Sequence, residues 1–244
     1  MDGIKSVTLD EMMNKIRKSS GCYLGSDRDV KSLAHFMGGF YSCKQMMGIL
    51  TEYEKKFHGS FREFILSEYA DSYHIDEIET IMPWDDIIRY IAPSDKDGME
   101  LFWELYDKFS DKFGTAPHDG QDGKMTAVTL DEILNKIRIR LGMWLGNDQD
   151  VKSLYHFIGG SYTCRQMMGI LTEYEKKFSL SFWSFIFYEY KDIGLFEKIG
   201  AIHPWYKIIQ YLAPADKEGI RLFWELYDKF IEKGGVQFRE SEAE

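Results

Sequence analysis

The chain has 244 residues, of which 44% are hydrophobic and 29% charged, and its formal net charge is -10 at pH 7. This composition is typical of a folded globular protein and excludes extensive disorder. The negative charge argues against direct nucleic-acid binding and against docking on an anionic membrane, because both require a basic face. It is compatible with a basic protein partner.

The N-terminal residues lack the basic region and apolar stretch of a secretory signal. No apolar run approaches the roughly 18 residues that cross a bilayer. The three cysteines, Cys22, Cys43 and Cys164, are odd in number and have no CxxC spacing, so a disulfide framework and a thiolate zinc site are both disfavoured. We therefore expect a cytoplasmic protein that needs no cofactor and no metal.

The chain contains two copies of one sequence. A shift of 121 positions aligns residues 8–112 with residues 129–233 without a gap, and about three positions in five are identical. The longest shared run is Gln45–Phe57, repeated as Gln166–Phe178. We call the two aligned segments the first copy and the second copy. A gapless match of this length indicates a duplication.

The duplication predicts two tandem homologous helical domains. A stretch rich in Gly, Asp and Pro separates them and indicates a linker. The polar end of the chain predicts a flexible acidic tail. The predicted boundaries are 1–114 for the first domain, 115–124 for the linker, 125–236 for the second domain and 237–244 for the tail.

The first copy begins with a helix signal. Thr8 and Glu11 have the spacing of a capping box, which predicts a helix over about 9–18. Two serines and two glycines then interrupt the helical pattern, until Asp27 or Asp29 caps the next helix. The apolar residues of that helix follow at helical spacing and are Val30, Leu33, Phe36 and Met37.

Gly38 and Gly39 interrupt this second helical pattern at a cost of about 1–2 kcal/mol relative to alanine. We expect them to permit close helix–helix packing or a kink. A ligand resting on the bare backbone is the alternative.

Further signals predict the remaining helices. Ser60 is a candidate cap, Pro83 suits the first turn of a short helix, and Ser94 begins the last one. The aromatic faces of these helices are expected to form core rather than a cofactor site. No segment alternates with period two. We therefore predict an all-α fold with about five or six helices per copy.

His35 and Cys43, which recur as His156 and Cys164, are the first candidates for chemistry. Eight residues along one helix separate the members of each pair by about 12 Å, which is too far for a Cys–His nucleophile. A buried, hydrogen-bonded histidine and a small apolar cysteine are the favoured interpretation.

Two carboxylate pairs, Glu52 with Glu54 and Glu104 with Asp107, could perform acid–base or metal chemistry. The first glutamate of each pair has a lysine four residues later, which is typical of a solvated helix face. No Gly-rich phosphate loop, GxSxG or HExxH motif is present. The sequence therefore predicts no catalytic and no metal-binding residues.

The two copies differ in charge. Residues 1–114 contain 14 Lys and Arg against 21 Asp and Glu, a balance of -7, whereas residues 124–236 contain 15 against 14, a balance of +1. We predict that an acidic cluster of the first copy meets a basic partner; a solvated loop that diverged freely is the alternative. The cluster consists of Asp71, Asp76, Glu77, Glu79, Asp85 and Asp86.

Several motifs carry a family resemblance. They are Cys22–Gly25, Val30–Leu33, His35–Tyr41, the helix of Trp84, and Leu101–Phe109. Together they resemble a family of small all-helical bacterial domains that includes immunity proteins encoded at toxin–immunity and contact-dependent inhibition loci. The likeness covers most of each copy, and its motifs are packing motifs, so it transfers no catalytic residue.

The resemblance implies an immunity protein that binds and neutralises a cognate toxin, a basic nuclease, by covering its active site. One alternative is an enzyme that uses carboxylates and His35 or His156 in a groove between the copies. Another is a scaffold or regulatory binding module unrelated to toxins.

Overall fold

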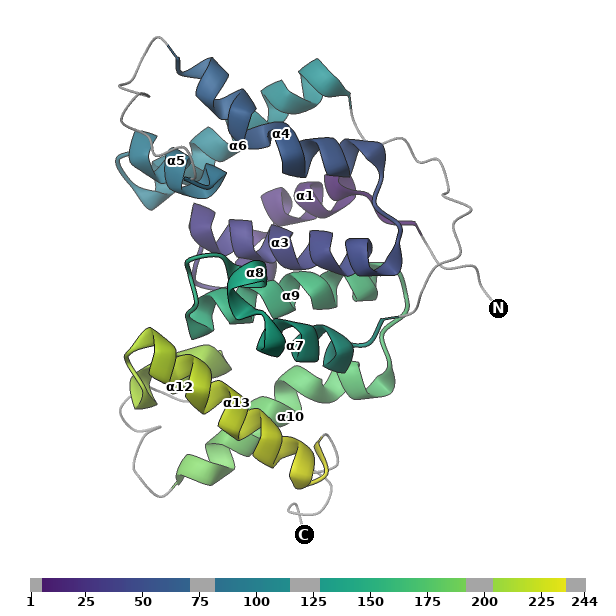
Figure 1. Ribbon diagram of the computed structural model, residues 1–244, viewed down its shortest axis with the longest axis vertical. Coiled ribbons are helices and arrows are strands. Elements are labelled where there is room, and N and C mark those ends of the chain that lie inside the picture. The colour runs from purple at the N-terminus through teal and green to yellow at the C-terminus, as the bar shows by residue number, and fades with distance from the viewer. Residues whose placement is uncertain (1–5, 71–81, 115–127, 192–203, 236–244) are drawn as a thin grey trace. The chain divides into compact units, whose positions relative to one another are not determined.

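The computed structural model describes residues 6–70, 82–114, 128–191 and 204–235 (Figure 1). Over these ranges it contains twelve helices and no strand, which confirms the predicted all-α class. The helices of the first copy are α1 Leu9–Lys18, α2 Ser20–Leu24, α3 Val30–Met47, α4 Glu52–Glu68, α5 Trp84–Ile91 and α6 Asp95–Phe113. Those of the second are α7 Leu130–Ile139, α8 Leu141–Leu145, α9 Val151–Met167, α10 Glu173–Tyr190, α12 Trp205–Leu212 and α13 Asp216–Glu232.

Polar side chains cap the starts of several helices. The Glu11 backbone N–H donates to the Thr8 hydroxyl at 3.2 Å, and the Thr8 backbone N–H donates to the Glu11 carboxylate at 3.0 Å. The capping box predicted at α1 is therefore confirmed. Thr51 begins α4 and Thr172 begins α10 in the same way, and the Asp29 side chain caps α3.

The interruption predicted after residue 18 contains a short helix in each copy. Ser19 ends α1 and precedes α2, and Gly25, with a φ of 62°, ends α2. Gly146, with a φ of 61°, ends α8 at the matching position. Five residues are too few to show an apolar periodicity, so the sequence pattern did not predict these two helices.

The chain divides into two compact units. Unit 1 comprises Met1–Thr129 and His156–Gly169, and unit 2 comprises Leu130–Tyr155 and Ile170–Glu244. Most of α9 therefore belongs to unit 1, although its sequence belongs to the second copy. The predicted domain limits at 114 and 125 place all of α9 in the second domain.

Aromatic rings fill the core of each unit, as expected from the sequence. In unit 1, where α5 packs against α3, α4 and α6, Phe61 lies 4.4 Å from Phe57 and 5.5 Å from Phe109, measured between ring centroids. In unit 2, Phe182 lies 5.4 Å from Phe230. The first pair is stacked and the other two are edge-to-face, and both arrangements add to the energy gained by burial.

A close helix contact in unit 1 explains the glycine pairs. A Cβ atom on Gly39 would lie 1.9 Å from the carbonyl oxygen of Phe157, and one on Gly160 would lie 1.8 Å from that of Phe36. The Ser161 hydroxyl donates to the Gly39 carbonyl oxygen at 3.0 Å in the same place. Only glycine permits this approach, so the predicted close packing is confirmed.

Candidate functional site

The predicted acidic cluster is described only in part. Asp71, Asp76, Glu77 and Glu79 lie outside the described residues. Asp85 and Asp86 occupy the first turn of α5, where Asp85 is 5% exposed. The Asp86 carboxylate pairs with Arg89 of the same helix at 3.0 Å. Of these two, only Asp86 presents its carboxylate to the surface.

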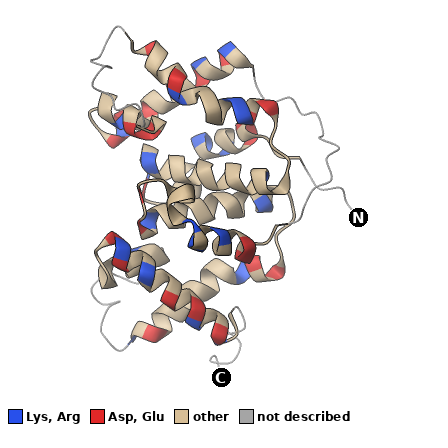
Figure 2. Ribbon diagram, in the orientation of Figure 1, with Lys and Arg blue, Asp and Glu red and all other residues tan. Residues whose placement is uncertain are grey.

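Charged residues of both signs alternate along the described helices. Figure 2 shows Lys and Arg beside Asp and Glu on most of them. Several form pairs within one helix, as Glu104 and Lys108 do at 2.8 Å. Exposed pairs of this kind contribute at most about 1 kcal/mol each.

The histidine and cysteines of the interface in unit 1 are buried. The His156 side chain is 1% exposed and its Nε2 lies 3.3 Å from the Asp27 carboxylate. Cys43 and Cys164 are fully buried free thiols. The prediction of a hydrogen-bonded core histidine and small apolar cysteines is confirmed for His156, Cys43 and Cys164, whereas His35 is only half-buried. A buried His156 also weakens the alternative in which this residue serves as an acid–base group.

The predicted solvated face is confirmed for Glu52, whereas its neighbour Glu54, which has no lysine at the i,i+4 spacing, is buried. Glu52 is exposed and pairs with Lys55 at 2.6 Å, rather than with Lys56 as its spacing suggested. Glu54 is only 2% exposed and forms an ion pair with Lys44, which is equally buried. The i,i+4 pattern could not reveal this pair because its cation comes from another helix.

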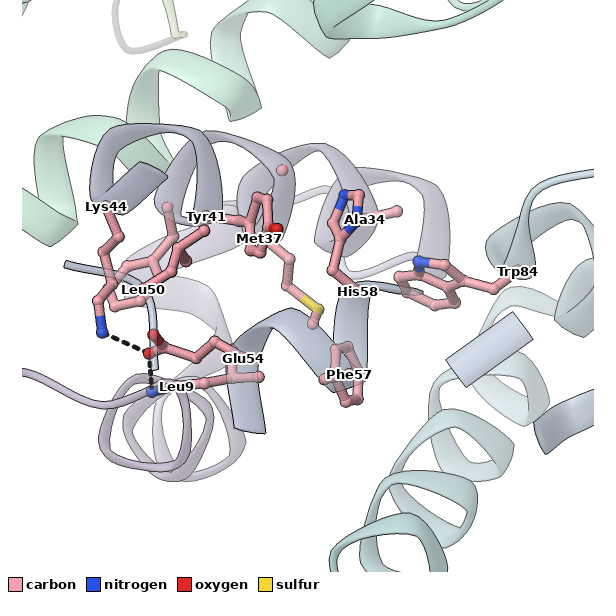
Figure 3. Close-up of a pocket in the computed structure, with 12 residues that line it drawn as sticks. Leu9, Ala34, Met37, Tyr41, Lys44, Leu50, Glu54, Phe57, His58 and Trp84 are labelled. Carbon is pink, nitrogen blue, oxygen red and sulfur yellow. Dashed lines mark hydrogen bonds and ion pairs between the residues drawn. The ribbon is translucent and has the colours of Figure 1, made fainter. Parts of the chain in front are cut away.

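A cavity of about 90 Å³ lies beside this ion pair, between α3, α4 and α5 of unit 1 (Figure 3). Figure 3 shows the side chains of α3 and α4 facing one another, with Lys44 and Glu54 at one end and Trp84 at the other. Apolar and aromatic groups supply most of the wall. The lining residues are Leu9, Ala34, Met37, Gly38, Phe40, Tyr41, Lys44, Leu50, Glu54, Phe57, His58 and Trp84.

Hydrogen bonds fix the inner end of the cavity. Lys44 donates to the Val7 carbonyl oxygen at 2.7 Å as well as to Glu54. The Glu54 carboxylate also accepts from the backbone N–H groups of Leu9 at 3.0 Å and Thr51 at 2.8 Å. Each buried charge is thereby neutralised and hydrogen-bonded, as burial of a charge requires. This end is a rigid wall with its polar groups satisfied.

Two stacked rings form the outer part of the cavity. The His58 imidazole lies 4.1 Å from the Tyr41 ring, measured between centroids, at an interplanar angle of 15°. Partial burial lowers the pKa of His58 and raises the pKa of Tyr41. Both rings are therefore uncharged at neutral pH, and each offers polar atoms beside an apolar wall.

The second copy differs from the first at the cavity. Tyr155 occupies the position of Ala34, and its ring lies 5.3 Å from Trp205 and 4.8 Å from Tyr206, between centroids. Trp205, which corresponds to Trp84, is 3% exposed. In unit 2 a tyrosine ring thus covers the tryptophan, whereas in unit 1 the small side chain of Ala34 leaves space against it.

Sequence reasoning missed the cavity, although its signal was present. In the second copy Tyr155 replaces Ala34, so a methyl group becomes a ring. Ser179 replaces His58, so a ring is lost. Both substitutions stand inside otherwise shared helices.

No protein-family model, no curated protein and no solved structure matches the chain. In the part of the chain that the structure describes, no three or more His, Cys, Asp or Glu side chains are grouped so as to hold a metal ion. None of the described helices is both long and apolar enough to span a membrane.

Proposed function

We propose that this protein is an immunity protein that binds a cognate protein toxin, a basic nuclease, in the bacterial cytoplasm and covers its active site. The observation that carries the proposal is the inequality of the two copies. The first has the negative balance of -7 and also the open aromatic cavity. The second is nearly neutral and has a tyrosine ring against its tryptophan.

The two features have complementary roles in binding. Negative charge accelerates encounter with a basic protein and aligns it. Affinity depends on a few aromatic contacts in a desolvated pocket. The cavity with Trp84 and Tyr41 provides such a place on the copy that carries the charge. Inhibition by coverage needs no catalytic group in the inhibitor.

We further infer that the chain arose by tandem duplication of one helical domain. In support, α1 and α7 begin 121 residues apart, as do α3 and α9, and α4 and α10. A single domain would suffice for binding. We assign binding to the first copy and a structural role to the second.

The test is inhibition of a purified nuclease by the purified full chain. Nuclease toxin domains encoded beside the gene are mixed with the protein, and residual nuclease activity is measured with the dissociation constant. We expect one domain to be inhibited at a one-to-one ratio, with an association rate that falls as salt rises. Binding to none of the neighbouring toxins would refute the proposal.

Two charge-reversal variants, one in each copy, test whether the first copy carries the toxin-binding surface. Asp76→Lys, Glu77→Lys and Glu79→Lys in one chain should slow association with the toxin. The control carries Glu218→Lys, Glu225→Lys and Glu232→Lys, three exposed positions of α13 in the second copy, and should associate like the parent. Equal slowing in the two chains would show that only net charge matters and that the first copy is not the binding copy.

A further inference from the structure

We propose that the cavity of the first copy is a binding site for one aromatic ring of the phenol type, supplied by a tyrosine side chain of the protein partner. The assignment to a partner rests on the proposed function. The site itself rests on unit 1 and on its comparison with unit 2.

The second copy shows how the counterparts of two cavity residues meet. Ala34 and Trp84 both line the cavity, and their counterparts Tyr155 and Trp205 contact each other through their rings at 5.3 Å. At the position of Ala34 the second copy therefore carries a phenol ring that packs against the counterpart of Trp84.

The wall of the cavity has the chemistry that a phenol requires. Trp84, Phe57 and Met37 offer apolar and aromatic surface to the ring. Aromatic pairs of this kind gain energy beyond the area they bury. Tyr41 and His58 are uncharged at neutral pH and have hydrogen-bonding atoms for a hydroxyl group.

The size of the cavity fits partial insertion. A closed cavity of about 150 Å³ in a protein core binds benzene. The present cavity measures about 90 Å³, and the exposed side chain of His58 places part of its lining at the surface. A ring can therefore enter by its edge while its hydroxyl group stays near water. The satisfied Lys44–Glu54 pair at the inner end leaves no unpaired charge to attract an ionic ligand.

The experiment uses p-cresol, which is the tyrosine side chain as a free molecule, and the full-length protein. Binding is followed by the NMR signals of the tryptophan indole N–H groups. We expect the Trp84 signal to shift with a dissociation constant in the millimolar range, as suits a ligand of this size. The saturated analogue 4-methylcyclohexanol should bind more weakly. An unmoved Trp84 signal, or equal binding of both compounds, would overturn the proposal.

Two reciprocal variants locate the site. Ala34→Tyr supplies the ring from within and should weaken p-cresol binding at Trp84 by at least about tenfold. Tyr155→Ala removes the ring from the second copy and should add a second binding event, seen at Trp205. Circular dichroism and thermal unfolding check that both chains fold. If Ala34→Tyr does not fold, Ala34→Leu is used, with the same expected weakening. Unchanged binding in a folded Ala34 variant would refute the site.

The same variant separates the site from the proposed function. If p-cresol binds at Trp84 but no toxin is recognised, the ring site stands and the immunity function falls. If a toxin binds and Ala34→Tyr leaves its affinity unchanged, the assignment of the ring to the partner is wrong. A toxin whose affinity falls tenfold or more with Ala34→Tyr supports both.

Discussion

Lys44 and Glu54 lie in the core of unit 1 with their charges paired and almost no exposure to water. Removal of two charges from water is costly, and their attraction compensates only when the remaining polar atoms are also bonded. Here Val7, Leu9 and Thr51 supply those bonds through the backbone. Glu54 thus joins α3, the start of α1 and the start of α4 at one point.

Loss of the lysine charge should destabilise the protein strongly. Lys44→Met leaves the Glu54 carboxylate buried without its cation, and we expect the free energy of unfolding to fall by about 3–5 kcal/mol. Urea unfolding followed by circular dichroism measures the change. Lys44→Arg is the control, because arginine stands at the matching position 165 of the second copy. A loss as large for Arg as for Met would contradict the argument from charge.

The protonation of His58 should make stability depend on pH. Because burial lowers its pKa in the folded state, the unfolded chain takes up a proton first as the pH falls through about 6.5. The free energy of unfolding therefore decreases below this pH. His58→Ser, which copies Ser179, should reduce the decrease in melting temperature between pH 7.5 and pH 5.5. The effect is small because His58 is partly exposed, and an equal decrease in both proteins would refute it.

Side-chain partners were the least predictable level from sequence. Glu52 could be assigned to a solvated face because its lysine partner lies on the same helix. Glu54 could not be paired with its cation, since Lys44 is ten residues away across a turn and the spacing of Thr51 and Glu54 indicates only a capping box. The cavity was missed because its wall is assembled from several helices. The changes from Ala34 to Tyr155 and from His58 to Ser179 mark it only when the two copies are compared.

At the scale of elements, local signals predicted most of the helices, but the cap predicted at Ser60 is wrong, because Ser60 lies inside α4, which Thr51 caps. The capping box at Thr8 predicted the start of α1, and the apolar spacing and the proline and serine signals predicted α3, α5 and α6. These signals depend on residues three or four positions apart, so they do not require contacts with the rest of the chain. The helix α2 has too few residues to show such a signal. Close helix packing at Gly38 and Gly39 was also predicted, but the identity of the helix that packs there was not.

The two glycines of α9 should respond differently to the same substitution. Gly160→Ala places a methyl group against the carbonyl oxygen of Phe36, and we expect a loss of about 1–3 kcal/mol or more as the helices separate. Gly159→Ala meets only ordinary contacts at 3.6 Å and should change stability by less than about 1 kcal/mol, with a gain in helix propensity. Thermal unfolding compares them. Similar losses at both positions would show that the close contact does not limit stability.

For the molecule as a whole, thiol labelling reports global opening. Cys22 is exposed, whereas Cys43 and Cys164 are fully buried. Burial and a hydrogen bond with the Cys43 thiol raise the pKa of Cys164, which suppresses its reactive thiolate. Iodoacetamide should therefore add one label to the native protein and three in concentrated urea, as counted by mass spectrometry. Three labels under native conditions would mean that this interface opens readily.

The whole-molecule prediction from sequence was right in class and incomplete in organisation. An all-α fold followed from helical spacing alone. The assignment of His156–Gly169 to unit 1 did not, because no glycine or proline marks a break at residue 156 and α9 continues through it. A linker signal identifies where sequence copies meet, and compact units are decided by side-chain packing.

The reciprocal glycine contact also bears on how the two sequences can diverge. Where two identical chains meet face to face, every substitution appears on both sides at once. Within a single chain each side mutates alone. The two sides of this contact do differ. Phe40 lies on one side and Ser161 at the matching position on the other, and both are buried. One side then keeps a bulky ring while the other keeps a small hydroxyl that donates to the Gly39 carbonyl oxygen, a combination that no symmetric pair can have.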